Sequence, residues 1–247
     1  GIKVIVDFDD AVFHNYDQLK LTNPFKFLLR NKIDVVMRNS SLVVCGNSYI
    51  AIRANEAGSH NTCIIPTVID LNKYKVTQRR GEKIIIGWIG TPVTDHSLDL
   101  IIPALEELSL EYKFVVKLIG SKKVISNIDT IHVPWSEERE SIDLEGIDIG
   151  IMPLKDNPME KGKCGYKLLQ YMARGKPVIG SSVGENKEII MDGVKGLHDK
   201  DQQDISKRIK ELGLDETLIN LKGLTPGMLV TLGEKKILTL EDFADLA

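Results

Sequence analysis

Cysteine is scarce in this sequence: the 247 residues include three cysteines, Cys45, Cys63 and Cys164. Their number is odd, they lie far apart and they form no CxxC pair. A disulfide framework and a structural zinc site are therefore not expected. This cysteine usage fits a protein of the reducing cytoplasm.

Aromatic residues are few, at 6% of the chain, whereas isoleucine, valine and leucine are plentiful. This balance favours buried parallel strands over a small all-β barrel. No apolar run approaches the roughly 18–20 residues of a membrane-spanning helix, and no signal peptide is recognised at the start. Neither sign of charge is in large excess, because 32 basic and 35 acidic residues give a net charge of −3. Direct binding of nucleic acid is therefore not expected.

Short β-branched runs alternate with longer amphipathic segments over residues 1–197. Strands are predicted at residues 2–6, 42–45, 64–66, 83–89, 114–119, 131–133, 147–152 and 177–179, and helices at 24–37, 48–55, 97–111, 136–144, 166–174 and 186–191. Strands separated by helices indicate βαβ crossovers, and hence an α/β protein with parallel, Rossmann-like sheets. A polar linker at residues 73–82 predicts a domain boundary between residues 1–75 and 83–197.

The character of the chain changes after residue 197, where short helical patterns are interrupted by glycines. Residues 205–247 are predicted to form a small all-α tail of helical hairpins. So few apolar residues barely offset the entropy of ordering this segment. We therefore expect the tail to pack on the preceding α/β domain, on a second copy of the chain or on a protein partner.

In doubly wound sheets, ligands bind beyond the carboxyl ends of the strands, where helix N-termini attract anions. Gly90 and Thr91 follow a predicted strand: Gly90 would let the backbone approach a phosphate, and Thr91 would donate a hydroxyl. An ordinary strand-to-helix turn remains an alternative. The loop has neither the GxGxxG pattern nor the Walker spacing, so a nicotinamide dehydrogenase and a P-loop enzyme are not supported.

A second loop, residues 153–167, carries four lysines and enters a predicted helix near Gly165. Positive charge and glycines at a helix N-terminus suit a diphosphate, although a solvated loop would also explain scattered lysines. A third loop places Pro134 and Trp135 just beyond a strand. Trp135 would line a base or sugar site, or would be a buried core residue.

Several segments together resemble a known family. They are DFDDAVF (7–13), VVCGN (43–47), WIGTP (88–92), PWSEE (134–138), DIGIMPL (148–154), GKCGYKLLQYMARGKPVI (162–179) and VGENKEI (183–189). Residues 1–197 thereby resemble the family 4 glycosyltransferases, and more narrowly a bacterial branch with a KCGFKLLQYMA-type segment. The resemblance implies GT-B architecture, with two facing Rossmann-like domains of which the first, acceptor-side domain is truncated here. It also implies sugar transfer from a nucleotide-diphosphate sugar, with retention and without a metal or other cofactor.

The resemblance assigns donor-binding roles to particular positions. Gly90 and Thr91 fall on the first phosphate loop, where Thr91 replaces a common arginine. Gln170 aligns with the second glutamate of an EX7E pattern, the one that hydrogen-bonds the donor ribose. The first glutamate falls on Gly162, so the pattern itself is absent.

Positive charge at the diphosphate is then assigned to Lys163 and Lys167, with Gly165 and Tyr166 at the helix start between them. Pro134 and Trp135 match the base-binding loop of the family. Asp9 falls near the position where many members place a histidine close to the transferred sugar, and it is the predicted catalytic residue.

The tail, residues 205–247, resembles the C-terminal acidic-repeat region of the bacterial transcription factor NusA, whose helical hairpins bind proteins. Two functions follow as alternatives. The first is a cytoplasmic glycosyltransferase with an unidentified acceptor; a lipid-linked acceptor would bring it to a membrane surface. The second is a non-catalytic chimera or fragment that binds a protein through the tail.

Overall fold

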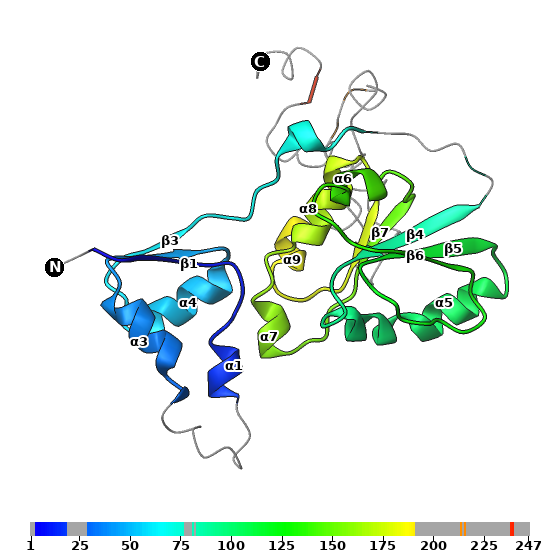
Figure 1. Ribbon diagram of the computed structural model, residues 1–247. Helices are drawn as coiled ribbons and strands as arrows, with labels where there is room; N and C mark the ends of the chain where they lie inside the picture. Colours follow the sequence, from blue (N-terminus) through cyan, green and yellow to red (C-terminus); the bar gives the residue numbers. More distant parts are fainter. Residues whose placement is uncertain are drawn as a thin grey trace. The chain divides into compact units, whose positions relative to one another are not determined.

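The computed structural model of this chain describes residues 3–18, 29–76, 81, 83–190, 213, 215, 238 and 239. The chain divides into two compact units (Figure 1). The first comprises Gly1–Ile69, Lys155–Tyr166 and Val183–Asn186, and the second comprises Asp70–Leu154, Lys167–Ser182 and Lys187–Ala247. This division cuts across the continuous segment 83–197 that the sequence predicts as one domain.

The first unit contains a parallel sheet in the order β1-β2-β3. Its strands are β1 (Ile5–Phe8), β2 (Leu42–Cys45) and β3 (Thr62–Ile64), and its helices are α1 (His14–Asp17), α3 (Lys32–Asn39), α4 (Ser48–Glu56) and α7 (Pro158–Lys161). A short 3-10 helix, η1 (Leu71–Lys73), follows in the linker, and α9 (Asn186–Ile189) begins at the last residue of this unit. In the apolar core of this unit, the inner face of β2 packs against α3 and α4. Met37, Val43 and Ile50 are fully buried there.

Two predicted strands of this unit have the wrong bounds. The strand predicted at residues 2–6 is β1, which continues through Phe8 because the parallel register pairs Phe8 with Cys45. The strand predicted at residues 64–66 is β3, which starts earlier because Thr62 pairs with Val43.

The helix predicted at residues 24–37 corresponds to α3, which ends two residues later; residues 19–28 lie outside the described residues. The helix predicted at residues 48–55 is α4, which is capped by Asn47. The side-chain oxygen of Asn47 accepts a hydrogen bond from the backbone nitrogen of Ile50 at 3.0 Å. This arrangement satisfies one of the free donors of the first helical turn.

The second unit is built on a five-stranded sheet in the order β6-β5-β4-β7-β8, with every pairing parallel. The strands are β4 (Ile84–Ile89), β5 (Phe114–Ile119), β6 (Thr130–Val133), β7 (Ile149–Met152) and β8 (Val178–Gly180). The chain first moves outward from β4 to β6 and then returns to place β7 on the other side of β4. This reversal makes the carboxyl ends of β4 and β7 the topological switch point, where ligands bind in doubly wound folds.

The helices of the second unit include η2 (Asp95–Leu100), α5 (Ile102–Ser109), α6 (Glu140–Asp143) and α8 (Tyr166–Ala173), whose first residue belongs to the first unit. The prediction of a single helix at residues 97–111 is wrong, because this segment forms two helices, η2 and α5. The reason is Pro103, whose ring and missing N–H are tolerated in the first turn of a helix but not in its interior. The helix predicted at residues 136–144 is also shorter in the structure: it is α6, and residues 137–139 form a turn.

Among the described residues, no helix combines the length and apolar character needed to span a bilayer. The predicted helical tail, residues 205–247, lies outside the described residues apart from positions 213, 215, 238 and 239.

Candidate functional site

The ends of β4 and β5 meet in the second unit through two glycines. A Cβ at Gly90 would lie 2.5 Å from the ring of Trp88, and a Cβ at Gly120 would lie 2.1 Å from the carbonyl oxygen of Gly90. Gly120 also has a φ of +83°, which disfavours other residues. Packing thus requires a glycine at position 90, and exposed Thr91 follows it at the carboxyl end of the strand.

Lys167 lies in the first turn of α8 and places its ammonium over the ring of Trp88, 5.6 Å from the centroid. Trp88 is fully buried, so its ring is a fixed platform for this cation–π contact. Gly90 and Lys167, both predicted donor-binding residues, therefore lie against the same indole. The structure brings a cation and a glycine turn together at the carboxyl end of β4.

Tyr171 fixes α8 over the switch point. Its hydroxyl accepts a hydrogen bond from the backbone nitrogen of Ile89, at 3.1 Å, and donates one to the carbonyl of Ile151, at 3.4 Å. A Cβ at Gly150 would lie 2.2 Å from the tyrosine ring, so this glycine lets the helix approach the sheet. Burial raises the pKa of Tyr171, and the side chain stays a neutral anchor.

Trp135 follows β6 and is 49% exposed, so the interpretation as a buried core residue is wrong. Its indole nitrogen donates to Glu140 at 2.8 Å. The same carboxylate accepts from the amide of Gln170 and from the hydroxyl of Tyr74. Pro134, which precedes Trp135, is exposed.

The remaining predicted site residues lie in the first unit. Lys163 forms an ion pair with Asp10 at 2.9 Å. Gly165 has a φ of +69° and leads into α8, whose first residue, Tyr166, is 41% exposed. Asp9 is exposed directly after β1.

Cys164 and Asn47 hold this segment of the first unit together. The thiol of Cys164 donates to the backbone oxygen of Asp9 at 2.8 Å, and the amide of Asn47 donates to the carbonyl of Gly162 at 3.0 Å. Burial raises the pKa of Cys164, which keeps it a thiol rather than a nucleophilic thiolate. Cys164 is therefore a structural residue that fixes the backbone on which Asp9 is carried.

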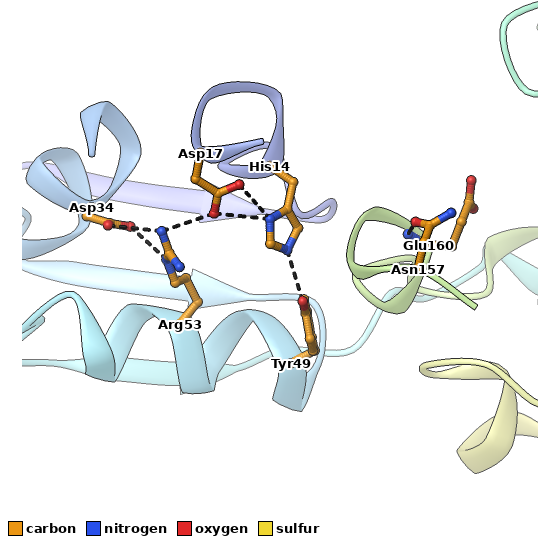
Figure 2. Close-up of polar contacts among 7 residues, drawn as sticks. All are labelled: His14, Asp17, Asp34, Tyr49, Arg53, Asn157 and Glu160. Carbon is orange, nitrogen blue, oxygen red and sulfur yellow. Dashed lines mark hydrogen bonds and ion pairs between the residues drawn. The ribbon is translucent and has the colours of Figure 1, made fainter. Parts of the chain in front are cut away.

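A polar network that the sequence did not reveal links three helices of the first unit (Figure 2). His14 contacts Asp17 through Nδ1 at 2.9 Å and the hydroxyl of Tyr49 through Nε2 at 2.9 Å. Arg53 forms ion pairs with Asp17, at 3.2 Å, and with Asp34, at 2.8 Å. The spacing of His14 and Asp17 was visible in the sequence, whereas the contacts of Arg53 depend on how α1, α3 and α4 pack.

Figure 2 also shows the start of α7, where the side chain of Asn157 accepts from the backbone nitrogen of Glu160 at 3.0 Å. This bond is a helix cap, and it shapes the lysine-rich loop that precedes α8. Over the part of the chain that the structure describes, no group of three or more His, Cys, Asp or Glu residues could hold a metal ion.

Comparison with known proteins assigns the chain to a family. Residues 83–215, more than half of the chain, match the family model described as "Glycosyl transferases group 1". The chain belongs to this family. The matched region contains the whole sheet β4–β8 and ends within the segment predicted as a helical tail.

A curated relative and several solved structures are also similar to this group 1 glycosyl transferase. The chain is 33% identical over 78 residues to a Bacillus subtilis protein named as a teichuronic acid biosynthesis glycosyltransferase, TuaH; the match covers 30% of this chain and 20% of that protein. Among solved structures, sucrose-phosphate synthase from Thermosynechococcus elongatus has a TM-score of 0.60 at 13% identity, covering 98% of this chain and 65% of that one. Anabaena HepE in complex with UDP and glucose has a TM-score of 0.62 at 16% identity, covering 99% of this chain and 71% of that one. The chain therefore has the parallel-sheet α/β fold of GT-B glycosyltransferases. It spans less than two thirds of the length of the sucrose-phosphate synthase.

Proposed function

We propose that this chain transfers a sugar from a nucleotide-diphosphate sugar, and that the second unit holds the nucleotide. The observation that carries the proposal is the contact of Gly90 and Lys167 with one buried indole, at the switch point of a doubly wound sheet. Membership of a glycosyl transferase family supports the reaction class. The HepE structure with UDP and glucose supports a donor of this chemical type.

The chemistry assigned to the donor side is electrostatic. As the bond between the sugar and the diphosphate breaks, the diphosphate retains the electron pair and gains negative charge. Lys167 and the positive end of the α8 dipole are suited to stabilise that charge. On the resemblance, we assign Lys163 a supporting role, which requires exchange of its partly buried ion pair with Asp10.

Other parts of the proposal rest on the resemblance to family 4 glycosyltransferases. They are retention of configuration, independence of a metal ion, a cytoplasmic location and a lipid-linked acceptor at a membrane surface. Asp9 is assigned to the transferred sugar because its carboxylate is exposed at the carboxyl end of β1. The bond from Cys164 to its backbone oxygen fixes the position of that residue.

Calorimetry with UDP, GDP, ADP and dTDP tests the donor site directly. We expect one of these diphosphates to bind measurably and its free nucleoside to bind much more weakly, because the cation at α8 recognises phosphate. Slow hydrolysis of the corresponding nucleotide sugar would support the transferase chemistry. A folded protein that binds none of the four diphosphates would contradict the proposal.

A second candidate function concerns residues 205–247 alone. Their resemblance to the acidic-repeat region of NusA favours binding of a protein partner or self-association. Stoichiometric association through this segment that does not respond to nucleotide would support the candidate.

A further inference from the structure

The carboxylate of Glu140 collects hydrogen bonds from three side chains of the second unit. Its Oε1 atom accepts from the amide of Gln170 at 2.5 Å and from the hydroxyl of Tyr74 at 3.1 Å. Its Oε2 atom accepts from the indole nitrogen of Trp135 at 2.8 Å. These donors come from the linker, from the loop after β6 and from α8, so the carboxylate is fixed by three separate segments.

All three of these donors are neutral. Arg174 lies over the ring of Tyr74, 5.8 Å from the centroid, but its ion pair is with Glu145, at 3.9 Å. Among the described residues, the donors to the carboxylate of Glu140 are therefore all uncharged, and no cationic side chain forms an ion pair with it. A carboxylate accepts about four hydrogen bonds, so one further donor can be accommodated.

A ligand for such a group has hydroxyl donors rather than phosphate oxygens. A phosphate would be repelled by the charge, whereas a hydroxyl forms a short, charge-assisted bond to a carboxylate. The ribose of a nucleotide offers two adjacent hydroxyls. Trp135, which Glu140 holds by its N–H and which is 49% exposed, offers an aromatic surface to the base of the same nucleoside.

The amide at position 170 is matched to this carboxylate. Gln170 is 1% exposed, and its Nε2 atom donates to Glu140. A glutamate at position 170 would place two carboxylates in hydrogen-bond contact, and both could not be ionised. The resemblance assigned the ribose contact to position 170, but the buried amide there is already bonded to Glu140.

We propose that Glu140 recognises the ribose hydroxyls of the donor nucleotide, and that Gln170 is a positioning residue that holds the carboxylate in place. This inference rests on the proposed function and deepens it, because it names the group that distinguishes a ribonucleotide from its deoxy form. In this arrangement, Glu140 at the start of α6 binds the ribose, while Lys167 at the start of α8 attracts the diphosphate.

The test compares ribose and deoxyribose ligands by calorimetry on the full chain. The probes are UDP and GDP with their 2′-deoxy and 2′,3′-dideoxy counterparts. The variants are Glu140→Gln, which keeps the shape and removes the charge, Gln170→Glu, and the double variant that exchanges the two groups. Tyr74→Phe is the matched control, since it removes one donor to Glu140 and leaves the carboxylate.

For the wild type, we expect the ribose form to bind about tenfold or more tightly than the dideoxy form, as one hydrogen bond to a charged acceptor implies. Glu140→Gln should bring this ratio close to one, whereas Tyr74→Phe should retain it. The exchanged double variant should recover part of the ratio that Gln170→Glu loses. If Gln170→Glu does not fold, the comparison of Glu140→Gln with Tyr74→Phe decides the question.

Two results would overturn the inference in distinguishable ways. If the wild type binds UDP or GDP but Glu140→Gln keeps the full ribose preference, Glu140 is not the ribose residue and the donor site itself stands. If the folded wild type binds none of UDP, GDP, ADP and dTDP, both the inference and the proposed function fail.

Discussion

The hydroxyl of Tyr171 lies 3.1 Å from the backbone nitrogen of Ile89 and accepts its hydrogen bond, which ties helix α8 to the last residue of β4. Both groups are buried. The helix that carries Lys167 and Gln170 is thereby fixed to the strand that precedes Gly90. The position of the candidate donor site depends on this contact.

Tyr171→Phe should lower the free energy of unfolding by about 1–3 kcal/mol, because it leaves the buried N–H of Ile89 without its partner. Urea unfolding monitored by circular dichroism measures the change. Tyr166→Phe, on the same helix and 41% exposed, is the control and should change stability little. Equal effects of the two substitutions would show that the bond to Ile89 does not anchor α8.

The sequence predicts the strands of the second unit well, because each is a short β-branched run between polar segments. The prediction for residues 114–119 agrees with β5 at both ends. It fails for β1, whose last residues are Asp7 and Phe8, since the extent of that strand is decided by pairing with β2 and not by hydrophobicity.

The candidate site is only partly visible in the sequence. Gly90 and Lys167 stand out by glycine and charge at strand and helix ends. Glu140 does not stand out, because its role depends on donors from Tyr74 and Gln170, which lie 66 and 30 residues away. Such contacts result from packing, which no local pattern encodes.

Lys167→Ala should weaken binding of a nucleoside diphosphate by about 1.5–3 kcal/mol, the range for a hydrogen bond to a charged group. Binding of the free nucleoside should hardly change, because the lost partner is phosphate. Lys113→Ala is the control, since Lys113 is exposed before β5, at the opposite end of the strands. Calorimetry that finds equal losses for diphosphate and nucleoside would mean that Lys167 acts through folding.

Arg53→Met should destabilise the first unit by about 1–3 kcal/mol, because it leaves the carboxylates of Asp17 and Asp34 without their shared cation (Figure 2). Adding Asp34→Asn to this variant should recover part of the loss, because one uncompensated charge is removed. Lys83→Met breaks the exposed pair with Asp129 and should have almost no effect. Chemical unfolding of the variants measures these differences, and additive losses in the double variant would argue against the network.

Cys45 should make stability depend on pH in the alkaline range. Burial is the main cause that raises the pKa of its thiol from 9.0 to about 11, so the folded state holds this proton more tightly than the unfolded state does. The resulting stability is present below pH 9 and is lost as the pH rises through 11, by about 2–3 kcal/mol in total.

Cys45→Ala should remove this part of the pH dependence, although it lowers stability at all pH values by creating a cavity. Cys63→Ala leaves Cys45 buried and should retain most of the dependence. Urea unfolding between pH 8 and pH 11 measures the slope for each protein. Parallel curves for wild type and Cys45→Ala would contradict the assignment.

Two deletions of different length test the tail. Residues 216–247 lie beyond the region that matches the glycosyl transferase family, whereas residues 205–215 fall within both that region and the predicted tail. Removal of 216–247 should leave nucleotide affinity unchanged, because it takes nothing from the family match. It should alter oligomeric state or solubility, since a segment with so few apolar residues is marginally stable on its own. If residues 205–215 pack on the second unit, removal of 205–247 should lower the unfolding temperature more than removal of 216–247 does.

Sedimentation and UDP or GDP calorimetry on both variants measure these outcomes. If removal of 216–247 abolishes nucleotide binding while the rest stays folded, the tail belongs to the donor site and is not a separate module.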